Sequence, residues 1–260
     1  SLDSIWVNVS YPNSSAIRLG LTNGGFVNFT PPVAGVYNIV FFANDTSGNT
    51  ANASSSFTAV APLPVNLSVT GRNGASLASN ITFYYAGTST QAAFYSSSTG
   101  NYGVQNVPNT SHDISINAYD GRVNIRLLGV DTQSNTNRMI VMDNPNVSGF
   151  IAVYAVNSSY SMGSARMRIS YSGINVSSEG TLKMQKCANW SFAASSCSGD
   201  WTDVTPATVD TDADYVQADV SSFSAYGLIQ GGYCGDGVCG SGESPSSCAS
   251  DCACNNGDTR

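Results

Sequence analysis

Charged side chains are scarce in this sequence. They make up 10% of 260 residues, well below the ~25% of an ordinary cytosolic domain. Only ten residues are Lys or Arg, and the formal net charge is -7. Nucleic acid is therefore not an expected partner, because phosphate binding needs a basic patch. Intrinsic disorder is also disfavoured, since hydrophobic residues reach 42% and net charge is modest.

Long apolar runs and helical patterns are also missing. No stretch of 18 or more apolar residues occurs, so we expect no membrane span. No signal peptide precedes Ser1, which predicts a processed product or a fragment. Apolar residues do not recur with a 3.6-residue period over any long segment, so we expect almost no helix.

Residues that commonly carry catalysis are few. Glu179 and Glu243 are the only Glu, and His112 is the only His. Paired acids for glycoside hydrolysis would therefore have to be Asp. His112 precedes Asp113, but no G-x-S-x-G motif supplies a nucleophile. We expect that the chain is not an enzyme.

An acidic triplet, Asp210, Asp212 and Asp214, leaves two interpretations open. An EF-hand loop starting at Asp210 would need Gly at position 6 and Glu at position 12. Those positions hold Tyr215 and Ser221. The triplet is thus expected to form a solvated turn, with a loose Ca²⁺ site as the alternative.

All seven Cys follow position 186. Two of them, Cys187 and Cys197, flank a short loop, and the other five crowd into the last part of the chain. Zinc sites usually combine C-x2-C pairs or nearby His, and neither occurs here. We therefore expect disulfides, with one Cys of the odd number free, bonded to another chain or paired outside the sequence. The five are Cys234, Cys239, Cys248, Cys252 and Cys254.

Three acidic residues of the Cys-rich tail, Asp236, Glu243 and Asp251, provide the only cofactor hypothesis. Small disulfide knots lack a large core, so these carboxylates could converge on Ca²⁺. The alternative is ordinary Asp-Gly turn chemistry. No other cofactor is expected.

N-x-[ST] sequons are abundant. The sequence holds twelve, about twice the roughly five or six that composition predicts. Glycans are bulky and must lie on an exposed surface, so we expect N-glycosylation and an extracellular location. The sequon residues are Asn8, Asn13, Asn28, Asn44, Asn52, Asn66, Asn80, Asn109, Asn146, Asn157, Asn175 and Asn189.

Short alternating segments between Gly, Asn, Pro and Ser predict an all-β fold of tandem sandwiches with a small disulfide-rich C-terminal knot. The expected strands lie at 5–9, 26–29, 37–42, 81–85, 113–118, 123–128, 150–156, 165–171, 181–186 and 215–220.

Domain boundaries are predicted from Pro and Gly. Ala61-Pro62-Leu63-Pro64 suggests a stiff joint, Asn144-Pro145-Asn146 a second break, and Gly231-Gly232 precedes the Cys cluster. The predicted segments are three sandwiches and a tail, at 1–61, 62–144, 145–230 and 231–260.

The first two segments carry resemblances to known modules. Residues 35–49, with the turn Asp45-Thr46-Ser47-Gly48-Asn49, and residues 57–60 resemble the last two strands of immunoglobulin-like repeats of microbial surface proteins. At about 61 residues this sandwich would be partial, because ~100 is usual. Residues 80–85, 98–102 and 112–118 resemble prealbumin-like, carboxypeptidase-regulatory-like sandwiches, which implies a stalk module.

Three later stretches resemble the C-terminal region of archaeal cell-surface and secreted proteins. They are residues 142–157, the Cys187 to Tyr226 region with Trp190 and Trp201, and the tail motif that begins Cys234-Gly235-Asp236-Gly237. Pro245 stands where this family often has another Cys. The resemblance implies an extracellular surface protein without a known activity.

These expectations favour a structural role. We expect a glycosylated subunit of a self-assembling filament, tube or surface layer, with copies joined by donor-strand complementation of the partial first domain. The alternative is an adhesin or carbohydrate-binding module of a larger secreted protein. In that alternative, aromatic residues would line a sugar-binding face: Trp6, Trp190, Trp201, Tyr84, Tyr85 and Tyr95.

Overall fold

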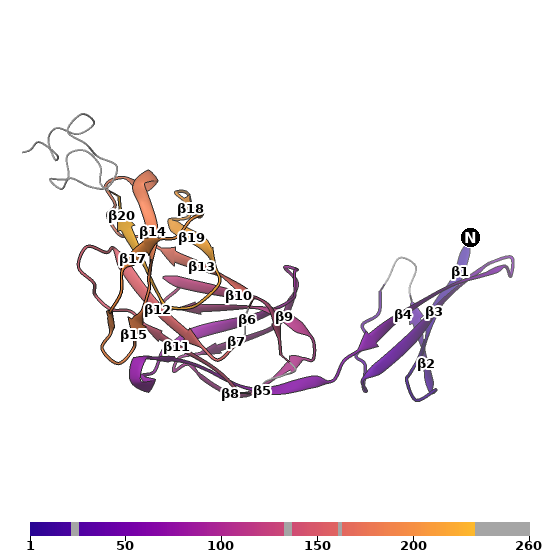
Figure 1. The fold of residues 1–260 in the computed structure, drawn as a ribbon. Helices are drawn as coiled ribbons and strands as arrows, with labels where there is room; N and C mark the ends of the chain where they lie inside the picture. The colour runs from indigo at the N-terminus through magenta and orange to yellow at the C-terminus, as the bar shows by residue number, and fades with distance from the viewer. Residues whose placement is uncertain (22–25, 133–136, 161–162, 232–260) are drawn as a thin grey trace, which may run out of the picture. The chain divides into compact units, whose positions relative to one another are not determined.

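The all-β fold class is confirmed. A computed structural model of the chain describes residues 1–21, 26–132, 137–160 and 163–231, apart from the side chain of Asn137. These residues form twenty β-strands and two short 3₁₀ helices, without an α-helix among them (Figure 1). The chain divides into a first unit, Ser1–Leu63, and a second unit, Pro64–Arg260.

The first unit contains one antiparallel sheet with the order β2-β1-β3-β4. Its strands are β1 (Leu2–Ser10), β2 (Ala16–Leu21), β3 (Gly35–Asp45) and β4 (Thr50–Ala59). The Asp45 carboxylate accepts hydrogen bonds from the backbone N–H groups of Ser47 and Asn49, which closes the predicted β3–β4 turn. In the described part of this unit no second sheet faces the first.

One expected strand of the first unit is wrong. Residues 26–29 belong to an irregular segment that runs from 26 to 34. Its Phe29 ring contacts Tyr37 and Phe57 edge-on, and Pro31-Pro32 follow it. Because Pro lacks a backbone N–H, these residues are poor partners in a sheet.

The second unit is a sandwich of two seven-stranded sheets (Figure 1). The first sheet has the order β18-β19-β13-β10-β9-β6-β7. Buried side chains alternate with polar ones along its strands, as in β10, where Val123, Ile125 and Leu127 are fully buried. This alternation places one face in the core. The strands are β6 (Ser79–Tyr85), β7 (Gln91–Ser97), β9 (Ser111–Ala118), β10 (Val123–Asp131), β13 (Ser164–Ser170), β18 (Ala207–Asp210) and β19 (Tyr215–Val220).

The second sheet has the order β17-β14-β20-β12-β11-β5-β8. Its pairing of β5 with β11 is parallel, whereas the other pairings described for it are antiparallel. The strands are β5 (Pro62–Gly71), β8 (Asn101–Pro108), β11 (Asn137–Asp143), β12 (Ala152–Ser158), β14 (Leu182–Cys187), β17 (Trp201–Asp203) and β20 (Ala225–Gln230).

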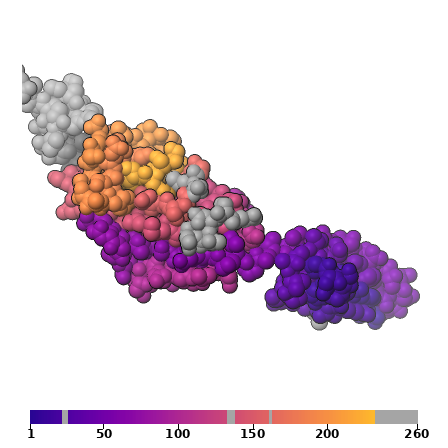
Figure 2. All heavy atoms as spheres, turned by 60° about the horizontal axis from the view of Figure 1, so that its bottom comes forward, coloured from indigo at the N-terminus to yellow at the C-terminus, as the bar shows by residue number. Residues whose placement is uncertain are grey.

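The predicted division of this region at 144/145 requires correction. Both sheets contain strands from 62–144 and from 145–230, so the two segments share one core and form a single sandwich. Figure 2 shows the purple to yellow parts of this unit packed as one body. Asn144-Pro145-Asn146 is only the loop between the paired strands β11 and β12. The predicted joint at 61–64 contains the boundary between the two units, which lies between Leu63 and Pro64, and strand β5 begins within it at Pro62.

Candidate functional surfaces

The two faces of the first unit's sheet differ in polarity. On one face, Val7 lies opposite Leu19 and Phe41, and Tyr37 lies opposite Phe57. Side chains two residues apart along a strand share a face, so this face is apolar over all four strands. We call it the apolar face: Ile5, Val7, Val9, Ile17, Leu19, Leu21, Tyr37, Ile39, Phe41 and Phe57.

This apolar face is only partly covered. Val7, Val9 and Tyr37 are the only buried hydrophobic residues described in the first unit. Phe29 packs at the Tyr37 end, where the Tyr37 hydroxyl donates to the Val33 carbonyl at 2.7 Å. Beside Phe29 a groove of about 370 Å³ remains. Its lining consists of ten apolar residues: Val7, Val9, Leu19, Leu21, Phe26, Val27, Phe29, Ile39, Phe41 and Phe57.

The opposite face carries polar residues and sequons. Asn8 and Asn44 share this face with Trp6 and Phe42, and Asn52 lies opposite Phe42. Trp6 stacks on Phe42 with ring centroids 5.2 Å apart. All three sequon Asn on the strands of this unit therefore lie on the face away from the apolar groove.

None of the twelve predicted sequon Asn is buried. Asn66, for example, is exposed between the buried Val65 and Leu67, so it projects from the outer face of the sandwich. Four are half-buried: Asn8, Asn44, Asn80 and Asn109. The other eight are exposed: Asn13, Asn28, Asn52, Asn66, Asn146, Asn157, Asn175 and Asn189. Their positions are compatible with glycan attachment.

One expected disulfide is present. Cys187 is bonded to Cys197, and the loop between them forms the short strands β15 (Trp190–Ser191) and β16 (Ser196–Cys197). This loop builds a second apolar cluster around Val153 and Ala155. At Gly227 a Cβ atom would lie 2.4 Å from the Phe150 ring, so glycine is required for this packing. The cluster consists of Val147, Phe150, Val153, Ala155, Cys187, Trp190, Phe192, Cys197, Trp201 and Ala225.

The predicted tail sites lie outside the described residues. This applies to the candidate Ca²⁺ ligands Asp236, Glu243 and Asp251 and to five of the Cys. These Cys are Cys234, Cys239, Cys248, Cys252 and Cys254.

His112 and Asp113 do not form a catalytic pair. They are consecutive in β9, so their side chains point to opposite faces. His112 is fully buried beside the Phe83 and Tyr85 rings, and burial lowers its pKa.

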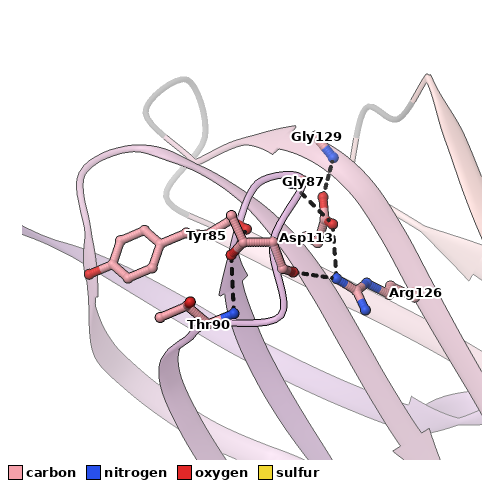
Figure 3. Close-up of polar contacts among 7 residues, drawn as sticks. Tyr85, Gly87, Thr90, Asp113, Arg126 and Gly129 are labelled. Atoms are coloured by element: carbon pink, nitrogen blue, oxygen red, sulfur yellow. Dashed lines mark hydrogen bonds and ion pairs between the residues drawn. The ribbon is translucent and has the colours of Figure 1, made fainter.

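Asp113 instead links the β6–β7 loop to strand β10 (Figure 3). Its carboxylate accepts hydrogen bonds from Arg126 Nη2 at 3.0 Å, from the Gly129 backbone N–H at 2.9 Å and from the Gly87 backbone N–H at 3.4 Å. The β6–β7 loop and two positions of strand β10 therefore converge on one buried carboxylate, which is a structural use of Asp113.

The acidic triplet forms the β18–β19 turn. Asp210 lies opposite Tyr215 at the end of the hairpin. Its pKa is lowered by a hydrogen bond from Tyr215 and by the backbone N–H of Ala213. Among the described residues, no three His, Cys, Asp or Glu gather in a way that could hold a metal ion.

The aromatic residues that we considered for a sugar-binding face do not share one. Trp6 lies in the first unit, whereas Trp190 and Trp201 pack in the disulfide cluster. Tyr95 contacts the core residue Phe83, and Tyr85 contacts His112. Tyr84 lies beneath the Arg126 guanidinium, 4.8 Å from ring centroid to Cζ.

A groove lined by arginines on the second unit was not predicted. It lies on the outer face of the first sheet and measures about 360 Å³. We call it the arginine groove, and its lining consists of Tyr84, Ser115, Asn117, Gly121, Asn124, Arg126, Arg166 and Arg168. In β10 and β13, Arg alternates with core residues, so the sequence of each strand alone indicates that these arginines lie on the outer face. That they lie side by side follows from the pairing of the two strands.

Comparisons against protein-family models, curated proteins and solved structures found no match to this chain. No helix among the residues described is long and apolar enough to cross a membrane.

Proposed function

We propose that this chain is an extracellular, glycosylated structural subunit, and that a second copy of the chain covers the apolar face of its first unit. The observation that carries the proposal is the two-faced sheet, with an apolar groove on one side and three sequons on the other. A sheet must bury its apolar face against another layer. Donation of a strand or a sheet by a second copy would supply that layer.

Two further observations support an extracellular location. The Cys187–Cys197 disulfide favours an oxidising compartment. None of the twelve sequon Asn is buried, and eight of them are exposed, so their positions are compatible with glycan attachment. The motifs that resemble microbial surface modules, including the archaeal C-terminal region, agree with a subunit of a surface filament, tube or layer.

The test compares two apolar residues of β3 that lie on opposite faces. Phe41 is 42% exposed on the apolar face, and Val36 is 54% exposed on the polar face. We expect Phe41→Asp to abolish concentration-dependent self-association in analytical ultracentrifugation, because it would bury an unpaired charge. Val36→Asp should leave association unchanged.

Three results would contradict the proposal. They are a wild-type chain that stays monomeric at high concentration, equal weakening by both substitutions, or covering of the groove by a different protein in native material. A second variant, Leu21→Asp, tests the same face from another strand. Negative-stain images of native material should show polymers.

A further inference from the structure

The second unit concentrates positive charge on one sheet face, although the chain is acidic overall. Arg126, Arg166 and Arg168 are three of only ten Lys and Arg in the sequence, and all three line the arginine groove. Arg126 lies directly opposite Arg166 in the β10–β13 pairing. Like charges placed opposite each other destabilise a sheet unless other groups compensate them.

Among the residues that the structure describes, carboxylates form ion pairs with two of the three guanidinium groups. Arg126 pairs with Asp113 at 3.0 Å, and Arg166 pairs with Asp219 at 2.8 Å. Arg168 Nη2 donates to the Gln217 amide oxygen at 3.0 Å. Within the described residues no carboxylate lies at ion-pair distance from Arg168. Arg168 is therefore the one guanidinium of the groove without a direct ion pair in the described chain, and Asp210 acts on it only at longer range.

Aromatic rings hold two of these arginines in place. The Arg168 guanidinium lies 3.9 Å from the centroid of the Tyr215 ring. The Arg126 guanidinium lies 4.8 Å from the centroid of the Tyr84 ring. Stacking of this kind fixes the guanidinium plane before binding. A planar carboxylate is the group that a fixed guanidinium binds best, through two parallel hydrogen bonds.

Neutral polar groups complete the lining. Asn124 Nδ2 donates to Ser115 Oγ at 2.7 Å and to Asn117 Oδ1 at 2.8 Å. This network orients amide and hydroxyl groups beside the guanidiniums, where hydroxyls of a ligand can exchange hydrogen bonds with them. Carboxylate and hydroxyl recognition together are characteristic of an acidic sugar.

We propose that the arginine groove binds a short saccharide that bears a carboxylate. A nucleic acid fits less well, because the net charge of -7 repels long polyanions and three arginines cover few phosphates. This binding activity does not depend on self-assembly and can be measured on monomeric chain.

The test is calorimetric titration of the full chain with a dimer of galacturonic acid at low salt. The chain is made without N-glycans, so that no sugar on Asn80, which lies opposite Asn117, competes. We expect the uronate to bind and neutral galactobiose not to. Arg168→Gln should weaken binding roughly 10- to 100-fold, as expected for a lost charge-assisted hydrogen bond pair.

Two matched variants distinguish recognition from general charge. Lys183→Gln removes one positive charge from another exposed ion pair of the same unit and should leave binding unchanged. Arg168→Lys keeps the positive charge but loses the planar guanidinium that can donate two parallel hydrogen bonds. Its affinity for the uronate should therefore lie between those of the wild type and Arg168→Gln. A chain that is folded but binds no uronate overturns the proposal. Three other results also overturn it. They are a loss of uronate affinity in Lys183→Gln equal to that in Arg168→Gln, binding of galactobiose as tight as that of the uronate, or binding of single-stranded DNA that is tighter than that of the uronate.

Discussion

The two units of this chain bury their apolar side chains in different ways. In the second unit two sheets bury each other, and the disulfide loop covers the outer patch around Val153 and Ala155. In the first unit, the single sheet has three buried hydrophobic residues among those that the structure describes. Eight of the twelve large hydrophobic residues that are exposed in the described chain lie in this unit of 63 residues.

This difference shows where the chain needs another molecule. A surface groove lined entirely by apolar side chains is typical of an interaction site. A unit of about 60 residues also buries a small fraction of its surface and is marginally stable alone. We therefore expect the first unit to gain stability from assembly and the second unit to have its stability already within the monomer.

The largest expected effect comes from making the same substitution in both units. Leu67 is 0% exposed in the core of the second unit, whereas Leu19 lines the open groove. Leu67→Ala should cost about 2–5 kcal/mol of unfolding free energy, because it leaves a cavity. Leu19→Ala in the monomer should cost less than about 1 kcal/mol, because water already reaches the site.

Urea unfolding followed by tryptophan fluorescence measures both costs. Trp6 reports on the first unit, and Trp190 and Trp201 report on the second, so a Trp6→Phe background isolates the second unit. An equal cost for both substitutions in the monomer would mean that the groove is already closed, and the contrast between the units would disappear.

Removal of the disulfide should have a smaller effect on the free energy of unfolding. Replacing both Cys187 and Cys197 by Ala opens a loop of ten residues, which should cost about 2–3 kcal/mol. Only the unfolding transition of the second unit should shift, and binding of a hydrophobic dye should rise as Val153 and Ala155 become uncovered. If the first unit's transition moves by a similar amount, the two units do not unfold separately.

The sequence predicts the local features of this fold well. Alternation in segments such as 123–128 is set by neighbouring residues along one strand, so it is visible without the fold. The same holds for the β3–β4 turn, where Asp45 caps the backbone of Ser47 and Asn49. The sequence also predicts disulfide bonding of Cys187 and Cys197, whereas their pairing with each other comes from the structure.

The domain count and the arginine groove depend on contacts that are distant in sequence. The parallel pairing of β5 with β11 joins residues about 70 apart, and no local signal announces it. For the same reason the sequence around Pro145 predicts a domain boundary that the structure does not have. Arg126 and Arg166 are opposite each other only because β10 pairs with β13. The unpaired charge of Arg168 could likewise be recognised only from the structure.

The smallest expected effect is the pH dependence of stability, which should also differ between the two units. His112, the only His of the chain, lies in the second unit, where burial lowers its pKa. As the pH falls below about 6.5, the unfolded chain takes up a proton that the folded chain resists, so stability decreases. The second unit should be less stable at pH 5.5 than at pH 7.5, whereas the first unit should not change.

Urea unfolding at several pH values in the Trp6→Phe background checks this expectation. His112→Phe keeps a ring beside Phe83 and Tyr85 but cannot bind a proton, so its unfolding free energy should be flat between pH 7.5 and 5.5. His112→Gln serves as a polar second variant and should be equally flat. If the unfolding free energy still depends on pH in both variants, the dependence arises from carboxylates. If the unfolding free energy of the first unit also depends on pH, the two units do not differ in this respect.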